Sequence, residues 1–307
     1  MQTIYFGAID IGSNAARLLI ASVNTDEPVS KIRKTILLRI PLRLGEDVFS
    51  TGRISEERIK KFIRMMKAYK HLMSIYEVED YMICATSAMR EASNGTKVAE
   101  TILDRTGMKI DIISGKDEAR LVYDSKIADE LNPDKTYMYV DVGGGSTEIS
   151  IIEGGRRSKS KSFGIGTLRL LAGKVNDSDW ASMSKWLAEA YSHSSDHEIE
   201  IIGMGGNINK LYRLANLAKG EKLSPEKLRN LYIRLKNLSR DERMIKYDMR
   251  PDRADVIIPA SEIFLFVCDR AKVSAINVPT IGLVDGIVHS LYEKYRKKSV
   301  KKRIIIK

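Results

Sequence analysis

Apolar and polar residues alternate in short runs at the start of the chain, with the period of two that is typical of strands. The pattern predicts strands at about 3–10, 15–23 and 30–40. The spacing then changes to the three- and four-residue repeat of an amphipathic helix over 55–76, for which Ser55 is a suitable N-cap. Further along, we expect a strand at 81–85, helices near 87–105, a strand at 109–113 and a helix over 116–130.

The same order of elements recurs in the second half of the chain. The predicted elements are strands at 136–141, 147–152 and 157–163, helices at 165–172 and 177–191, a strand at 198–202, helices at 206–217, 225–237 and 251–270, a strand at 273–277 and a final helix from about 282. Three antiparallel strands followed by alternating helices and strands, twice over, indicate a mixed α/β sheet in each of two domains. We expect the boundary inside or just after the helix over 116–130, where Asn132-Pro133-Asp134 favours a turn.

The composition is that of a soluble globular protein. The chain has 307 residues, of which 43% are hydrophobic, enough for two domains with their own cores. No apolar stretch approaches the roughly 20 residues that span a bilayer, so we expect no membrane segment. The N-terminal sequence runs directly into a glycine loop, which argues against a removable signal. Cys84 and Cys268 lie in apolar surroundings, which favours buried free thiols in a reducing cytoplasm.

The net charge of +11 raises the question of a nucleic-acid partner. The last 14 residues, Lys294 to Lys307, contain six lysines, two arginines and no acid, so the rest of the chain carries only +3. Cations are favoured at helix C-termini. The basic clusters at 31–34 and 156–161 are not interleaved with aromatic residues, as a base-stacking surface would be. We therefore do not expect nucleic acid as a partner, although the tail can contact anions.

Two glycine loops carry the most informative chemistry, Asp10-Ile-Gly-Ser-Asn14 and Asp141-Val-Gly-Gly-Gly-Ser-Thr-Glu148. Each lies between two apolar runs, which predicts a tight hairpin turn whose backbone N–H groups form a nest for phosphate oxygens. The aspartate at the head of each loop and Glu148 do not favour a bare phosphate. They make sense if a divalent cation lies between them and the phosphate, and Mg²⁺ is the usual ion. The two loops thus suggest a duplicated fold that clamps a phosphorylated substrate.

Three further segments follow predicted strands and suit an anion. Ala85–Asn94 brings Arg90, whose planar fork suits a phosphoryl group. Ser114–Arg120 places Glu118 in a first helical turn, and Gly203–Asn207 precedes a helix N-terminus. Each segment alone has an ordinary explanation as a turn, a surface ion pair or a helix-start acid. Together with the two loops they favour one ligand site, because ligands of open α/β sheets gather at strand ends.

Further catalytic arrangements fit the sequence poorly. Cys84 and Arg90 have the C-x₅-R spacing of cysteine-dependent phosphatases, but no glycine lies between them and Cys84 continues the apolar alternation of its strand. The four histidines form no zinc-ligand pattern. The chain also lacks a G-x-S-x-G elbow and a G-x-x-x-x-G-K-[ST] loop.

These segments, in this order, resemble the exopolyphosphatase / guanosine pentaphosphate phosphohydrolase (Ppx/GppA) family in a short, two-domain form. The resemblance runs through nearly the whole chain and is carried by DIGSN, ATSAMREASN, ISGKDEARLVY, DVGGGSTE, GIGTLRL, GMGGN and RADVIIPA. It implies two ribonuclease-H-like domains of the actin, sugar kinase and heat-shock chaperone ATPase superfamily, with the active site in the cleft between them. The implied domains are residues 1–128 and 129–282, with a C-terminal helix at about 283–307 that packs back on the first.

The resemblance also implies roles for residues. The general base is Glu118, supported by Arg90 in catalysis; Asp141, Glu148 and Asp10 are assigned to Mg²⁺. The phosphate-binding set is Gly12, Ser13, Asn14, Arg90, Gly143, Gly144, Gly145, Ser146, Gly205 and Gly206. The chain departs from the family's usual pattern at Ala15, where a hydroxyl is more common, and at Asn207, where a smaller residue or a hydroxyl is.

The implied activity is release of terminal phosphate from inorganic polyphosphate. The sequence is equally compatible with removal of the 5′ γ-phosphate from guanosine pentaphosphate in the same site, since both substrates present a terminal phosphoanhydride. It also leaves open an ATP-dependent kinase or ATPase of the same fold, and a non-catalytic sensor that binds polyphosphate or guanosine tetraphosphate. Family analogy also suggests a homodimer.

Overall fold

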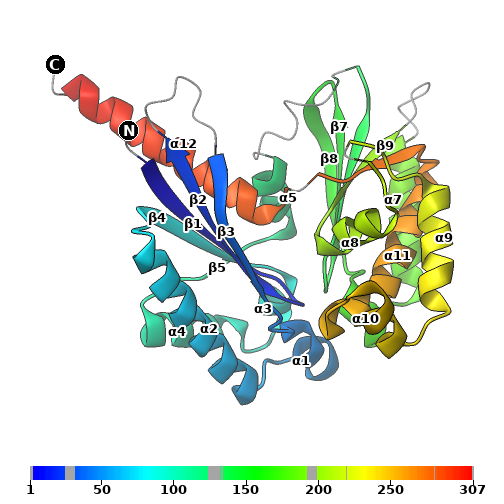
Figure 1. Cartoon of the computed structure of the whole chain (residues 1–307), viewed down its shortest axis with the longest axis horizontal. Helices are drawn as coiled ribbons and strands as arrows, with labels where there is room; N and C mark the ends of the chain where they lie inside the picture. Colours follow the sequence, from blue (N-terminus) through cyan, green and yellow to red (C-terminus); the bar gives the residue numbers. More distant parts are fainter. Residues whose placement is uncertain are drawn as a thin grey trace. The chain divides into compact units, whose positions relative to one another are not determined.

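The computed structural model describes residues 3–24, 32–123, 132, 134–191, 199–218, 220–279 and 281–305 (Figure 1). The chain divides into two compact units. Unit 1 consists of Met1–Lys126 with Gly282–Lys307, and unit 2 of Ile127–Ile281. The predicted boundary at 128–129 and the end of the helix predicted over 116–130 lie outside the described residues.

Unit 1 is built on a five-stranded sheet of order β3-β2-β1-β4-β5. Strands β1, β2 and β3 are antiparallel neighbours, whereas β4 and β5 continue the sheet in parallel from β1. The strands are β1 (Thr3–Ile11), β2 (Ala16–Asn24), β3 (Ile32–Ile40), β4 (Asp80–Ala85) and β5 (Asp111–Ile112); the helices are α1 (Leu44–Thr51), α2 (Glu56–Ile75), α3 (Ser87–Glu91), α4 (Gly95–Thr106), α5 (Gly115–Tyr123) and α12 (Leu283–Ile305).

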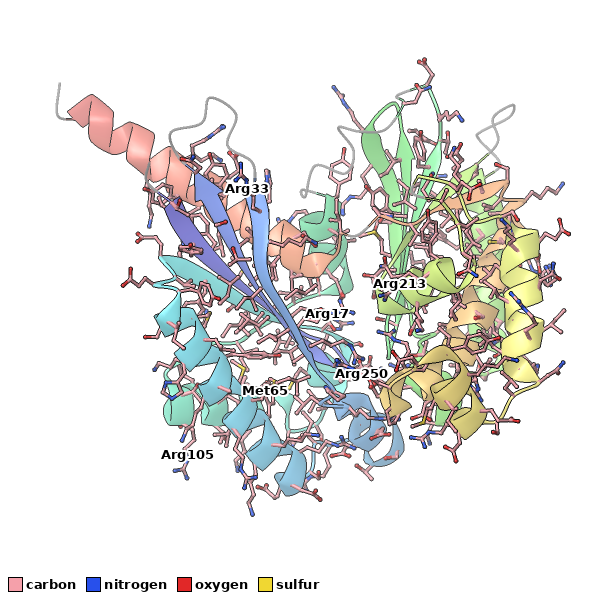
Figure 2. The ribbon with its side chains drawn as sticks, in the orientation of Figure 1. Arg17, Arg33, Met65, Arg105, Arg213 and Arg250 are labelled. Carbon is pink, nitrogen blue, oxygen red and sulfur yellow. The ribbon has the colours of Figure 1, made fainter. Side chains whose placement is uncertain are left out.

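Helices cover both faces of this sheet. Successive strand residues point to opposite faces, so the neighbours Phe6 and Gly7 of β1 show which helix covers each face. The ring of Phe6 packs edge-on against Tyr292 and Tyr295 of α12. On the other face, a Cβ atom on the neighbouring Gly7 would lie only 2.7 Å from the Met73 sulfur of α2. Figure 1 shows α12 along one face, and α2 and α4 along the other. Met65 of α2 is buried, whereas Arg105 of α4 extends into solvent (Figure 2).

Unit 2 repeats the arrangement with a sheet of order β10-β9-β6-β7-β8. Strands β6, β7 and β8 form the antiparallel part, and β9 and β10 continue in parallel from β6. The strands are β6 (Tyr137–Val142), β7 (Thr147–Glu153), β8 (Arg156–Phe163), β9 (Glu200–Met204) and β10 (Ala275–Asn277); the helices are α6 (Thr167–Leu171), α7 (Asp177–Tyr191), α8 (Gly206–Leu214), α9 (Pro225–Lys236), α10 (Arg240–Tyr247) and α11 (Pro251–Ala271). The repeated strand order confirms the predicted fold class of two mixed α/β domains.

The core of unit 2 lies between its sheet and the long helix α11. Trp180 of α7 packs at a tilt against Phe266 of α11, with ring centroids 4.6 Å apart, and Phe163 of β8 packs edge-on against Trp186, with centroids 5.6 Å apart. At the start of β9, the buried Glu200 accepts hydrogen bonds from Lys222 (2.7 Å), Lys135 (2.9 Å) and Asn277 (2.8 Å). This network ties β9 to the neighbouring strand β10 and to the segments before β6 and after α8.

The structure corrects several predicted elements. Helices α1 and α10 fall in segments that were not predicted as helices, and the strand predicted at 109–113 has only two residues. The helices predicted near 87–105 are confirmed as α3 and α4, and the chain turns between them. There the Asn94 side chain bonds both backbone groups of Ile54 (2.8 and 2.9 Å). Among the described helices, none is both long and apolar enough to cross a membrane.

Candidate active site

The first glycine loop joins β1 to β2 as a tight hairpin, which confirms its predicted turn. Ile11 pairs with Ala16, and the Gly12 N–H donates to the Ala15 carbonyl at 3.2 Å. The carbonyls of Ser13 and Asn14 point toward the start of α1, where they accept the N–H groups of Gly45 (2.8 Å) and Arg43 (2.9 Å). These bonds hold the backbone of the loop in one conformation.

Side chains around the first loop come from the parallel strands beside it. The hydroxyls of Ser13 and Ser87 lie 2.8 Å apart and are buried. Ser87 begins α3, which follows directly from β4, the parallel neighbour of β1. The carboxyl ends of β1 and β4 therefore bring the predicted phosphate loop and the segment of Arg90 to one edge of the sheet.

Asp10 pairs with a cation across the hairpin. Its cross-strand partner is Arg17, whose Nη1 lies 3.2 Å from Oδ2 (Arg17 is labelled in Figure 2). Burial raises the pKa of Asp10, and the positive charge of Arg17 partly offsets that effect. Because Arg17 already compensates the charge of Asp10, this aspartate is a weaker candidate for a metal than the paired acids of the second loop.

Arg90 and Glu118 lie at the next strand ends of the same unit. Arg90 donates from Nη1 to the carbonyl of Ile113 at 2.8 Å, which fixes its guanidinium beside the residues that follow β5. Glu118 is in the first turn of α5 and its N–H donates to the Ser114 carbonyl at 3.0 Å. The side chain of Glu118 is partly buried, with Oε2 shielded from solvent. Unit 1 thus places Gly12–Asn14, Arg90 and Glu118 at one edge of its sheet.

The second glycine loop joins β6 to β7 with the same register as the first. Val142 pairs with Thr147, and the Gly143 N–H donates to the Ser146 carbonyl at 2.9 Å. Here too, the loop carbonyls meet the start of a helix. The carbonyl of Gly143 accepts from Thr167 N–H (3.0 Å) and that of Gly144 from Leu168 N–H (2.8 Å).

Close packing fixes the other side of this loop. A Cβ on Gly166 would lie 2.4 Å from the carbonyl carbon of Gly145, so no larger residue fits there without moving the loop. Arg169 donates from Nε to the Gly145 carbonyl at 2.8 Å. With its carbonyls bound by α6, the turn of three glycines has the backbone character of a nest for anions.

Two carboxylates stand opposite each other at the base of the second loop. Asp141 and Glu148 are a cross-strand pair, in the register positions that Asp10 and Arg17 occupy in unit 1. Glu148 is buried, and its Oε1 accepts hydrogen bonds from the hydroxyls of Ser146 (2.6 Å) and Ser162 (2.9 Å). Adjacent carboxylates repel each other unless a cation lies between them, so this donor set fits a hard divalent ion.

The glycines after β9 lie beside this carboxylate pair. Gly205 has a positive φ of 93°, and a Cβ on it would lie 2.9 Å from Oδ1 of Asp141. Gly206 begins α8, and a Cβ on it would meet the guanidinium of Arg253, which also bonds Asn207. Unit 2 therefore gathers Asp141, Glu148 and the glycine segments at the carboxyl ends of β6 and β9.

The predicted site residues thus form two groups, one in each unit. Their meeting in one interdomain cleft stays a prediction. Within the described part of the chain, no three His, Cys, Asp or Glu side chains come together as a metal site. A Mg²⁺ ion at Asp141 and Glu148 would need further oxygens from water and substrate, which is how this ion is usually bound.

A cysteine nucleophile finds no support in the structure. Cys84 is a buried free thiol in β4. Burial raises its pKa to about 12, helped by the nearby negative charges of Asp10, Asp111 and Glu118. A thiol in this state is not a nucleophile. Cys268 is also a buried free thiol, so the predicted state of both cysteines is confirmed.

Several residues that shape these loops were not predicted from the sequence as part of the site, among them Arg17, Ser162, Gly166 and Arg169. Arg17 has a readable signal, because it stands seven residues after Asp10 just as Glu148 stands seven residues after Asp141. Ser162 carries no signal. It is one of several serines in a strand that alternates basic residues with serine, and only the pairing of β8 with β7 brings it to Glu148.

A model of the Ppx/GppA phosphatase family matches residues 29–295. The chain therefore belongs to this family of phosphoanhydride hydrolases. Exopolyphosphatase 2 of Mycobacterium tuberculosis is 26% identical over 311 residues, which cover 92% of this chain and 97% of that protein. A solved structure of the Aquifex aeolicus family member has a TM-score of 0.74 and 27% identity, covering 96% of this chain and 99% of that one.

A further relative is longer. The bifunctional 3-dehydroquinate synthase/phosphatase of Fusobacterium nucleatum is 29% identical over 286 residues, which are 85% of this chain. The chain spans only 43% of the length of that relative.

Proposed function

We propose that this chain is a Mg²⁺-dependent exopolyphosphatase, which releases the terminal phosphate of inorganic polyphosphate by attack of a water molecule held by Glu118. One observation carries the proposal: the paired carboxylates Asp141 and Glu148 stand beside a triple-glycine loop in a member of the Ppx/GppA family. The similarity to an exopolyphosphatase over nearly the full length of both chains supports the choice of substrate.

In this proposal the two loops bind the terminal phosphate. The N–H groups of Ser13 and Asn14 and of Gly144 to Ser146 donate to its oxygens, because the carbonyls of both loops are turned toward helices. Gly12 and Gly143 shape the two turns around the phosphate, with their own N–H groups bound within the loops. Arg90 adds a guanidinium with five donors; the bond to Ile113 orients the group and leaves donors for a phosphoryl oxygen. Gly205 and Gly206 add the N-terminus of α8.

The second part of the proposal concerns charge and the attacking water. Mg²⁺ held by Asp141 and Glu148 would neutralise charge on the phosphoryl oxygens. Glu118 accepts a hydrogen bond from water, aligns it with the terminal phosphorus and takes its proton as the new P–O bond forms. The bridging P–O bond breaks, and the shortened polyphosphate chain leaves with the electron pair on its terminal oxygen. Phosphoryl transfer needs mainly positioning and charge compensation, and these residues supply both. Asp10 contributes indirectly, through its ion pair with Arg17.

Two further functions are compatible with the same site. Guanosine pentaphosphate offers the same terminal phosphoanhydride, and the name of the Ppx/GppA family covers both activities. A sensor that binds these polyanions without turnover is the non-enzymatic candidate. Two buried reduced thiols fit a cytoplasmic location for any of the three. Assembly as a homodimer is a further proposal from the family resemblance.

The test is phosphate release from long-chain polyphosphate, guanosine pentaphosphate and ATP in parallel, with Mg²⁺ and with a chelator. The proposal expects the fastest release from polyphosphate and none without Mg²⁺. Preference for guanosine pentaphosphate would identify the chain as a guanosine pentaphosphate phosphohydrolase, and fast ATP turnover would favour an ATPase. Tight binding of polyphosphate without release of phosphate would favour the sensor.

A further inference from the structure

Helix α1 is the element on which the first glycine loop rests. The N–H groups of Arg43 and Gly45, at the start of this helix, donate to the carbonyls of Asn14 and Ser13. The N-terminus of the helix lacks a side-chain cap of its own, and Arg43 adopts the left-handed conformation (φ 54°). The start of α1 therefore depends on contacts from outside the helix.

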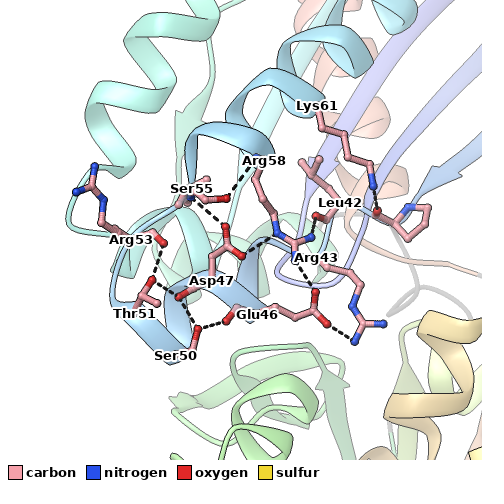
Figure 3. Close-up of polar contacts among 12 residues, drawn as sticks. Leu42, Arg43, Glu46, Asp47, Ser50, Thr51, Arg53, Ser55, Arg58 and Lys61 are labelled. Atoms are coloured by element: carbon pink, nitrogen blue, oxygen red, sulfur yellow. Dashed lines mark hydrogen bonds and ion pairs between the residues drawn. The ribbon is translucent and has the colours of Figure 1, made fainter.

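Arg58, in the first turn of α2, supplies these contacts with its whole guanidinium (Figure 3). Its Nη1 donates to the Leu42 carbonyl at 2.7 Å, just before α1. Its Nη2 lies 2.5 Å from Oε2 of Glu46, and its Nε lies 2.9 Å from Oδ1 of Asp47, both in the first turn of α1. One side chain thus bonds the polypeptide on both sides of Arg43.

Two more contacts reinforce those made by Arg58. The second oxygen of Asp47 accepts the Ser55 N–H at 2.9 Å, and Ser55 is the N-cap of α2. The guanidinium of Arg43 lies 2.5 Å from Oε1 of Glu46. Figure 3 shows the bonds converging on the turn between α1 and α2. The Arg58 side chain is only 22% exposed, so water competes poorly for these bonds.

We propose that Arg58 is a positioning residue for the first phosphate loop, acting through the start of α1. Because the loop carbonyls are held by residues 43 and 45, any loosening of this segment frees the loop N–H groups from their fixed directions. A lysine cannot replace Arg58, since a single ammonium does not reach three acceptors in a planar fork. The second loop has its own helix, α6, and does not depend on Arg58.

The significance of this role for catalysis rests on the proposed function, but the positioning itself does not. Hydrogen–deuterium exchange of the full-length chain tests it without any substrate. The variants are Arg58→Lys and Arg58→Met, and the matched control is Arg64→Lys, which changes a second arginine on the same helix. The segments to follow are 42–48, the first loop at 10–17 and the second loop at 141–148.

We expect both Arg58 variants to speed exchange about tenfold in 42–48 and in 10–17, with 141–148 and the control unchanged. Faster exchange in 42–48 alone would overturn the proposal, because the loop would then keep its conformation without the contacts of Arg58. Equal acceleration in all three segments would also overturn it, since that result marks a global loss of stability.

A kinetic readout then connects the loop to the substrate. In Arg58→Lys, kcat/KM for polyphosphate should fall about tenfold while Arg64→Lys stays at the wild-type value. If the wild-type protein releases no phosphate, the proposed function fails, and the exchange experiment still decides the role of Arg58. If exchange changes as expected but kcat/KM does not, the loop does not bind the reacting phosphate.

Discussion

Gly286, in the first turn of α12, lies directly against the backbone of α5. A Cβ at this position would stand 1.8 Å from the carbonyl oxygen of Leu121 and 2.5 Å from its carbonyl carbon. Both helices belong to unit 1, and α5 carries Glu118 one turn before Leu121. A Gly286→Ala substitution therefore acts on the element that positions the proposed general base.

The geometry sets the size of the effect. Ordinary contact between such atoms begins near 3.4 Å, so the two helices must separate by about 1.6 Å to admit the methyl group. The obstacle is backbone, and no side chain can rotate out of the way. Overpacking of this kind costs about 1–3 kcal/mol, against which alanine returns about 1 kcal/mol through its higher helix propensity. We expect a net loss of stability of up to about 2 kcal/mol.

The loss of activity should be larger than the loss of stability suggests. A displacement of α5 by more than about 1 Å moves the Glu118 carboxylate relative to the substrate, and misplacement on this scale costs about a hundredfold in rate. We therefore predict that kcat for phosphate release falls about a hundredfold in Gly286→Ala, with a smaller change in KM because the glycine loops are untouched.

The assay pairs kcat with urea denaturation, at a temperature where both proteins are fully folded. Gly282→Ala is the matched control, because it makes the same change one turn earlier and a Cβ there meets nothing within 4 Å. A Gly286→Ala protein that is destabilised yet keeps kcat within twofold of wild type would show that the α5–α12 contact does not position Glu118. An equal loss of activity in the control would show the same.

Three further changes test separate parts of the structure. Ser162→Ala removes a hydroxyl bond to Glu148 and should weaken Mg²⁺ binding about tenfold in a calorimetric titration, whereas Ser160→Ala, two residues earlier on the same strand, should not. Gly166→Ala should displace the second loop and reduce activity about a hundredfold, while Gly164→Ala, which has open space around it, should stay active. For Glu200, burial raises the pKa, but hydrogen bonds from two lysines and an asparagine outweigh burial and lower it to about 2. The stability from this lowered pKa is present above the unfolded value near 4.5 and is lost as pH falls toward 2. Urea unfolding of Glu200→Gln should therefore show a loss of unfolding free energy of about 2 kcal/mol at pH 7, which shrinks below pH 4. An equal loss at both pH values would contradict this linkage.

Much of the architecture could be predicted because local and long-range preferences agree. The two hairpins have apolar strands on both sides of a glycine turn, and Ser55 caps α2 as expected, accepting the Arg58 N–H at 3.4 Å. The repeated strand order follows from the repeated order of apolar runs. The five segments singled out for phosphate chemistry all lie at strand ends, because that is where glycine and polar residues interrupt the alternation.

The missed helices lack the signals on which such predictions depend. Helix α1 begins after an arginine in the left-handed conformation, and it is held by Arg58 from another helix. Helix α10 buries none of its residues, so it has no apolar stripe to detect. Its one readable signal is the capping box formed by Ser239 and Glu242, in which each side chain bonds the backbone of the other.

The residues that fix the loops were hidden for a related reason. Ser162 and Arg58 act through partners 14 and between 11 and 16 positions away in the chain, so no local spacing marks them. Gly286 looks like any helix glycine until its distance to Leu121 is known. Positions whose own chemistry suits a ligand could be singled out from the sequence, whereas positions that hold other residues in place required the structure.

The most direct test of the central claim is the activity of Glu118→Gln, measured together with its affinity for polyphosphate. Asp117→Asn is the control, because it alters the neighbouring acid of the same helical turn, whose carboxylate bonds Ser114 and not the proposed water. We predict that Glu118→Gln loses phosphate release about a thousandfold while it binds long-chain polyphosphate within about threefold of wild type. A Glu118→Gln protein that keeps most of its Mg²⁺-dependent phosphate release would contradict the assignment of Glu118 as the general base.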